Sequence, residues 1–251
     1  LHQWGAEKLY WEKDSSRSWV RPAYEEMAAT LQPGDTVVVS GYEHNAVCRP
    51  LYAIPEVRLT VVDAPPFRRE QAAEEFRRAI LAGADAVIVN HVSNVFGCVQ
   101  PLEEIAGVCR SRGVPLLVDA SQSAGTLPLH LTELGAAFIA MPGHKGLYGP
   151  QGTGLLLCGE RPARPLLLGG TGSASRDRQM PPTLPDRLEA GTHNMPGIAG
   201  LFLVLPWLRE RPRWFSRTAL AIIGLFFLDA AIKGFLRDYF GLRPNPILVL
   251  Q

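Results

Sequence analysis

A lysine in a glycine-rich segment is the residue of this chain best suited to covalent chemistry. Lys145 stands in the run Gly-His-Lys-Gly that begins at Gly143, just after the apolar stretch 136–140. Glycine lets the backbone turn sharply and approach a bulky ligand closely, and His144 adds a second hydrogen-bonding group beside the amine. The pattern predicts a lysine that carries a cofactor, with a solvated lysine in a surface loop as the alternative.

A carboxylate precedes this lysine by one strand and one connection. Residues 114–122 read Val-Pro-Leu-Leu-Val-Asp-Ala-Ser-Gln, which is typical of a short buried strand that ends in Asp119. The order of strand, carboxylate and lysine favours the cofactor-bearing interpretation of Lys145.

The elements that must position these residues alternate between strand and helix. Such alternation, with uniformly apolar strands, predicts an α/β fold whose mostly parallel sheet is sandwiched by helices. Ligands bind beyond the carboxyl ends of the strands in sheets of this kind, and Asn94, Asp119 and Lys145 lie at or just past such ends. The predicted strands are 36–40, 57–62, 86–90, 116–119, 137–140 and an antiparallel 154–158, and the predicted helices are 21–31, 70–81, 101–112 and one that begins near 197.

Five short motifs resemble those of fold-type I enzymes that use pyridoxal phosphate (PLP), within the class V aminotransferase and cysteine desulfurase group. The motifs occur in that family's order and at its spacing, over about residues 31–205. The resemblance implies a PLP-binding large domain over this range, and it leaves 1–30 and 206–251 unassigned, as segments of a different origin. The motifs are Glu43-His44-Asn45-Ala46-Val47, His91 to Gly97, Val118 to Gly125, Gly143 to Gly146, and Arg187 to Asn194.

The resemblance implies roles for three residues around the cofactor ring. Lys145 would hold the aldehyde as a Schiff base once its amine, with an ordinary pKa of about 10.4, has lost a proton. Asp119 would pair with the pyridine nitrogen and keep it protonated, so that the ring accepts electrons from the substrate's α-carbon. His44 would lie flat against the ring and could move a proton. As alternatives without a cofactor, Asp119 could be an ordinary strand-end aspartate, and His44 could be a packed histidine.

Further polar residues are expected to complete the cofactor site. Gln122 could donate to the phenolate oxygen of the ring, and Asn94 could do the same or reach the substrate carboxylate, although either could be a loop-capping amide. The resemblance assigns Ser121 and His144 to the phosphate. It also implies that Thr192 reaches the phosphate of a neighbouring subunit, which predicts a homodimer with its active sites at the interface.

Two parts of the resembled enzymes have no counterpart that we can identify. One is a Gly-x-x-Thr turn before residue 36, which would supply phosphate donors at a helix N-terminus. The other is a C-terminal domain with a nucleophilic cysteine and a carboxylate-binding arginine. Cys98 is the one thiol near the predicted site, and we interpret it as a small packed residue.

The reaction follows from the resemblance, with alternatives. We expect desulfuration of L-cysteine to L-alanine and enzyme-bound sulfur, with a sulfur-acceptor protein as a possible partner. Transamination of a small amino acid is the second hypothesis. A non-catalytic remnant that keeps the fold is the third, because of the missing parts.

Composition narrows the class of partner and the compartment. The 251 residues carry a formal net charge of +1, which gives no argument for nucleic acid and favours a small-molecule site. The four cysteines are scattered without a Cys-x-x-Cys pair, which indicates a reducing cytoplasm and argues against a structural zinc site. No secretory signal is evident at the N-terminus.

The tail is apolar enough to raise the question of a membrane segment. Its unbroken apolar run, 219–228, is ten residues long, whereas a spanning helix needs about 20. A longer span would include Asp229 and Lys233, at a cost of about 2.5–3.5 kcal/mol each at its centre. The run is therefore as consistent with a buried helix as with a membrane segment, and we do not expect membrane contact through the tail.

Overall fold

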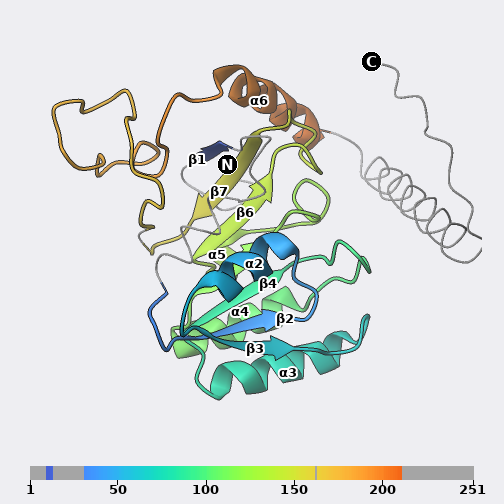
Figure 1. The fold of residues 1–251 in the computed structure, drawn as a ribbon. Coiled ribbons are helices and arrows are strands. Elements are labelled where there is room, and N and C mark those ends of the chain that lie inside the picture. The colour runs from blue at the N-terminus through green and yellow to red at the C-terminus, as the bar shows by residue number, and fades with distance from the viewer. Residues whose placement is uncertain (1–9, 14–30, 162, 211–251) are drawn as a thin grey trace, which may run out of the picture. The chain divides into compact units, whose positions relative to one another are not determined.

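The computed structural model describes residues 10–13, 31–161 and 163–210 (Figure 1). The predicted helix 21–31, apart from its last residue, and the tail 211–251 lie outside these ranges. Along the described part of the chain, no helix combines the length and apolarity that crossing a membrane requires.

A seven-stranded sheet forms the centre of the described chain, in the order β1-β7-β6-β5-β4-β2-β3. The five strands from β6 to β3 are parallel, and β7 runs antiparallel to β6, so the predicted α/β fold with its mostly parallel sheet is confirmed. The strands are β1 (Tyr10–Lys13), β2 (Thr36–Ser40), β3 (Arg58–Val62), β4 (Ala86–Asn90), β5 (Leu116–Asp119), β6 (Phe138–Pro142) and β7 (Thr153–Cys158).

The edge strand β1 comes from the segment that the sequence leaves unassigned. Its residues pair antiparallel with β7, with Tyr10 opposite Leu156 and Lys13 opposite Thr153. Residues 10–13 are therefore part of the main sheet, whereas the sequence left the whole 1–30 segment unassigned. Their four residues of Trp, Tyr, Glu and Lys have no apolar run that would predict a strand.

Two of the helices were not expected from the sequence. Helix α2 contains Pro50 and only nine residues, and α5 is a single turn, so neither shows a periodic apolar pattern long enough to predict a helix. The last helix continues through Pro206, across the predicted boundary at residue 205. The helices are α2 (Asn45–Ala53), α3 (Arg69–Leu81), α4 (Leu102–Arg112), α5 (Leu131–Leu134) and α6 (Met195–Glu210).

Alternate residues of the strands face two separate cores, as the pleat of a strand requires. Val38 and Val118 belong to the larger core, against α3, α4 and α5, and α6 adds Leu201 to it. Val37 and Leu117 belong to the smaller core, against α2. Figure 1 shows α2 and the α3–α4 pair on opposite sides of the sheet. We call these the α3–α4 face and the α2 face.

Candidate active site

The predicted site residues collect at one edge of the sheet, where the parallel strands end. His44 follows β2, Asn94 follows β4, Asp119 ends β5 and Lys145 follows β6. The strands β4, β5 and β6 are direct neighbours, with Asp119 paired to Asn90 on one side and to Ala140 on the other. Four chain segments that are far apart in sequence therefore meet at this edge.

Asp119 is a buried carboxylate on the α2 face. Its side chain shares the alternation of Leu117, two residues earlier in β5, which packs in the smaller core. The residue is 3% exposed, and its Oδ1 accepts a hydrogen bond of 2.8 Å from the backbone N–H of Ser121. This turn holds the carboxylate at the strand end in one orientation.

The backbone of the lysine loop is packed too closely for side chains at two of its glycines. A Cβ at Gly143 would overlap the hydroxyl of Thr153 in β7, and one at Gly146 would overlap the carbonyl oxygen of Ala124, in the turn after β5. Lys145 lies half-buried between these two contacts. The glycines therefore serve close packing of the backbone, which ties the lysine loop to β7 and to the turn after β5.

Hydrogen bonds close the same loop behind Lys145. The backbone carbonyl of Lys145 accepts from the N–H of Tyr148 at 2.9 Å, and the carbonyl of Gly143 accepts from the N–H of Gly149 at 2.7 Å. Tyr148 has a φ of 55°, a conformation that is uncommon for a residue other than glycine. The loop is thus a compact turn, and the position of the lysine Cα relative to β5 is determined by backbone contacts.

His44 begins helix α2 and uses one ring nitrogen to cap it. Nδ1 accepts a hydrogen bond of 3.1 Å from the N–H of Ala46, as residues at a helix N-cap do. A neutral imidazole that accepts at Nδ1 carries its proton on Nε2. Because α2 covers the α2 face, this imidazole belongs to the same side of the sheet as Asp119.

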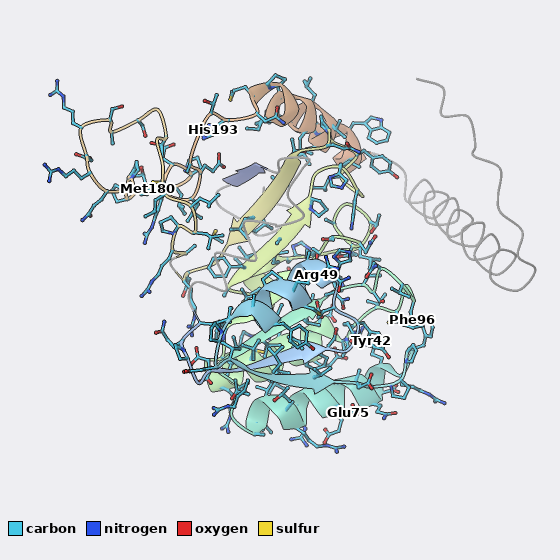
Figure 2. The ribbon with its side chains drawn as sticks, in the orientation of Figure 1. Tyr42, Arg49, Glu75, Phe96, Met180 and His193 are labelled. Carbon is cyan, nitrogen blue, oxygen red and sulfur yellow. The ribbon has the colours of Figure 1, made fainter. Side chains whose placement is uncertain are left out.

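Asn94 lies in a tight turn after β4. The Oγ of Ser93 accepts from the N–H groups of Val95 and Phe96 at 3.3 and 3.2 Å. The ring of Phe96 packs edge to face on Tyr42, with centroids 5.6 Å apart (Figure 2). This contact connects the loop after β4 to the loop after β2, next to His44.

The other predicted residues differ in exposure. Ser121 is buried and Gln122 is half-buried in the turn after Asp119, whereas His144 is exposed beside Lys145. Thr192 is exposed on the segment that leads into α6, and two residues later the amide of Asn194 donates to the carbonyl of Gly152, just before β7. The strand ends and the turns that follow them therefore carry every predicted site residue apart from Thr192, which lies on the segment before α6.

Glu43 is a site residue to which the sequence assigns no role. One carboxylate oxygen, Oε1, accepts from the hydroxyl of Ser40 and, at 2.8 Å, from the N–H of Asn90. Burial raises the pKa of this carboxyl to about 8, and the negative charge of Asp119 acts in the same direction. Its place directly before His44, in the first motif, is the signal that could have drawn attention to it.

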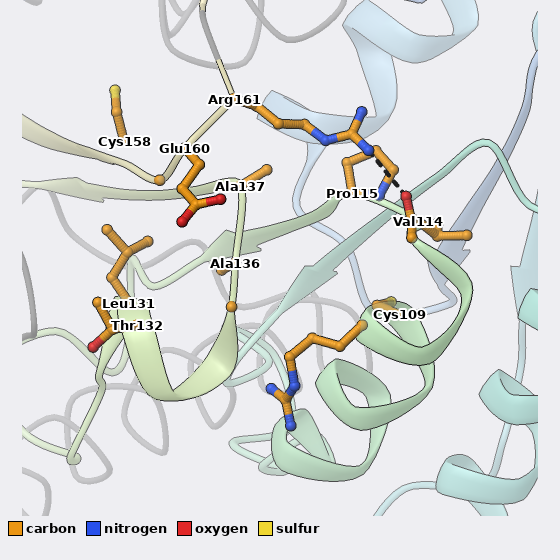
Figure 3. Close-up of a pocket in the computed structure, with 14 residues that line it drawn as sticks. Cys109, Val114, Pro115, Leu131, Thr132, Ala136, Ala137, Cys158, Glu160 and Arg161 are labelled. Atoms are coloured by element: carbon orange, nitrogen blue, oxygen red, sulfur yellow. Dashed lines mark hydrogen bonds between the residues drawn. The ribbon is translucent and has the colours of Figure 1, made fainter.

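Neither Cys98 nor a separate hollow at the other ends of the strands contributes to the predicted site. Cys98 is 4% exposed, and burial raises the pKa of its thiol, which agrees with a packed residue. A hollow of about 750 Å³ lies at the opposite edge of the sheet (Figure 3), and its lining contains Val114 before β5, Ala137 before β6 and Arg161 after β7. It is separate from the strand ends that carry Asp119 and Lys145.

The strand-end residues fit a pyridoxal cofactor. PLP requires an amine for its aldehyde and an acid partner for its ring nitrogen. Lys145 and the buried carboxylate of Asp119 offer these groups at the ends of adjacent strands, and the imidazole of His44 belongs to the same face. The segment in which a phosphate-binding Gly-x-x-Thr turn was expected, before residue 36, is described only over 10–13 and 31–35.

Comparison with protein families finds the aminotransferase class-V family, whose model matches residues 12–213. This range is wider than the 31–205 covered by the motifs, so the motifs alone underestimate the match at both ends. It includes part of β1 and all of α6.

Individual cysteine desulfurases are similar to most of this chain. A probable cysteine desulfurase of Methanothermobacter thermautotrophicus is 38% identical over 184 residues, which are 68% of this chain and 44% of the relative. The apo structure of a cysteine desulfurase from Thermococcus onnurineus NA1 superposes with a TM-score of 0.66 at 27% identity, covering 81% of this chain and 52% of that one. The chain thus spans about half the length of these relatives.

A further solved structure shows the cofactor in the same fold. It is a variant of C-DES with glycine covalently linked to its PLP cofactor, with a TM-score of 0.65 and 22% identity over 81% of this chain and 56% of that chain. At this identity the similarity shows the fold alone.

Proposed function

Because the chain belongs to the class V aminotransferases, a family of PLP-dependent enzymes, we propose that it forms the cofactor-binding large domain of a cysteine desulfurase. The substrate would be L-cysteine, and the products would be L-alanine and enzyme-bound sulfur. The names of its relatives support the desulfurase over the aminotransferase reaction. One structural observation carries the proposal, namely the buried Asp119 beside the backbone-locked loop of Lys145.

Three residues would perform the chemistry at the ring. Bound PLP supplies an electron sink for the carbanion that forms at the substrate's α-carbon. Lys145 would hold the cofactor aldehyde through Nζ and, when displaced by substrate, provide an amine that can take a proton. Asp119, fixed by the N–H of Ser121, would keep the ring nitrogen protonated. His44 would cover the ring and transfer a proton through Nε2.

The remaining predicted residues would bind and orient. Gln122 and Asn94 would donate to the phenolate oxygen, or Asn94 to the substrate carboxylate, and Ser121 and His144 would hold the phosphate. The exposed position of Thr192 supports its proposed contact with the phosphate of a second subunit. The protein would then be a homodimer that passes sulfur to an acceptor protein, in the reducing cytoplasm.

Replacing Lys145 tests the cofactor assignment directly. We expect the wild-type chain with added PLP to show the visible absorbance band of lysine-bound PLP, and Lys145→Ala to abolish it, because Lys145 is the only lysine within the described ranges 31–161 and 163–210. Lys233→Ala, which removes a lysine of the tail, is the control and should keep the band. A band that survives in Lys145→Ala would refute the assignment.

Adding L-cysteine then tests the reaction. Equal amounts of sulfide, released by a reductant, and alanine would support desulfuration. Conversion of PLP to its amine form with pyruvate-type products would support transamination instead. A normal band without either product would assign this chain to cofactor binding without turnover.

A further inference from the structure

Glu43 joins the ends of two strands through one of its oxygens. Oε1 accepts from the hydroxyl of Ser40, at the end of β2, and from the N–H of Asn90, at the end of β4. The side-chain amide of Asn90 donates in turn to the carbonyl of Tyr42. The carboxyl group therefore organises the point where β2 turns toward His44 and where β4 lies beside Asp119.

The second oxygen of Glu43 has no partner within the described chain. Oε2 is inaccessible to solvent and makes no hydrogen bond, although the residue as a whole keeps some exposure. Within the described residues, no basic side chain forms an ion pair with Glu43. A buried carboxylate whose donors are neutral is costly to ionise, whereas a neutral acid needs only an acceptor for its O–H.

The groups around Glu43 do not offset a negative charge. Ser40 and Asn90 are neutral donors, and Asp119 of β5 is a second carboxyl. Burial raises the pKa of the Cys48 thiol on α2, and a negative charge on Glu43 would raise the pKa of this thiol further. His44 follows directly in the chain and uses Nδ1 to cap α2. Two carboxyl groups near one another and out of water favour a state in which only one is ionised.

We propose that Glu43 is a positioning residue that remains a neutral acid at neutral pH, ties the ends of β2 and β4 together, and thereby orders the strand ends around Asp119, the proposed partner of the cofactor ring. This inference rests on the proposed function for the role of Asp119. The protonation of Glu43 itself does not, because it follows from contacts within the chain.

The protonation state has a measurable effect on folding. The pKa of Glu43 is raised from 4.5 to about 8 in the folded chain, so the folded state binds this proton more tightly than the unfolded state. The associated stability is fully present below about pH 4.5 and is lost as the pH rises toward 8. Linkage limits the loss to about tenfold in the folding equilibrium constant for each pH unit.

Chemical unfolding of the chain without PLP tests this protonation. We expect the stability of Glu43→Gln relative to wild type to increase from pH 5.5 to about 8 and to level off above, because glutamine has no proton to lose. Glu70→Gln, at an exposed position on α3, should follow the pH dependence of wild type. Parallel curves for Glu43→Gln and wild type would overturn the proposal.

Infrared spectra of the wild-type chain keep the test independent of how well the variant folds. A protonated carboxyl C=O band should be present at pH 6 and absent at pH 9. Its absence at pH 6 would contradict a neutral Glu43.

PLP binding tests the positioning role. Glu43→Gln keeps both hydrogen bonds to its carbonyl oxygen, so its affinity for PLP at pH 7 should stay within about twofold of wild type, whereas Glu43→Ala should lose about tenfold. The band of lysine-bound PLP should show a pH-dependent step near 8 in wild type that is missing in Glu43→Gln. Equal affinities for all three chains would overturn the positioning role, and failure of wild type to bind PLP would overturn the proposed function while leaving the unfolding test intact.

Discussion

The two faces of the sheet receive very different amounts of cover from the described helices. The α3–α4 face packs against three helices and part of a fourth, with fully buried side chains such as Phe76 and Ile105. On the α2 face only α2 contributes buried side chains among the described helices, through Val47 and Leu51. Asp119 and His44 belong to this thinly covered face. Within the described residues, apolar burial is thus concentrated on one side of the sheet, and the groups suited to chemistry lie on the other.

Truncating a side chain in the core of the α3–α4 face should cause the largest loss of stability and leave PLP binding unchanged. Phe76→Ala removes a ring that is 1% exposed, and such a cavity costs about 3–5 kcal/mol. Urea unfolding should report this loss, while the PLP affinity of the folded fraction should stay unchanged. A large drop in PLP affinity at low urea would show that the two faces are coupled.

A truncation on the α2 face should cost less stability but should also weaken cofactor binding. Leu51→Ala, at a position that is 3% exposed in α2, should cost about 2 kcal/mol, at the low end of the range for such changes because fewer side chains surround it. It should also weaken PLP binding, since α2 carries His44 at its N-terminus. If Leu51→Ala and Phe76→Ala affected PLP binding equally, the contrast between the faces would fail.

A loss of comparable size is expected from the lysine loop. Gly146→Ala would push a Cβ into the carbonyl oxygen of Ala124, and we expect a cost of about 1–3 kcal/mol from this overpacking, with a weaker band of lysine-bound PLP. Gly107→Ala is the matched control, because nothing lies within 4 Å of a Cβ at that position on α4. It should stabilise the chain by about 0.5–1 kcal/mol, and melting curves of both variants would show the difference in sign.

Strong local patterns made much of the fold predictable. The apolar runs of β2, β4 and β5 are long enough to predict strands, and Gly113 in the left-handed region ends α4 where the periodic pattern stops. The short or irregular elements were not predictable, because β1, α5 and the Pro50-containing α2 depend on contacts with distant residues. Pro206 suggested an end to α6 that packing does not impose.

The site was predictable to the extent that it follows strand ends. Asp119 and Lys145 could be placed because chemistry-bearing residues follow apolar strands, and adjacent parallel strands end at one edge. The role of Glu43 was not predictable, because a glutamate in a turn usually points into water. Its burial became apparent only when β4 placed the N–H of Asn90 against it.

The amino-acid sequence by itself determined the α/β class, the family resemblance and the order in which carboxylate and lysine leave the sheet, because these depend on local patterns and spacing. The tertiary structure alone decided that β1 joins the sheet, which face carries Asp119, and why Gly143 and Gly146 flank the lysine. It also decided the environment of Glu43. The physical reason is that burial, backbone overlap and the protonation of a carboxyl group depend on atoms from segments far apart in the chain.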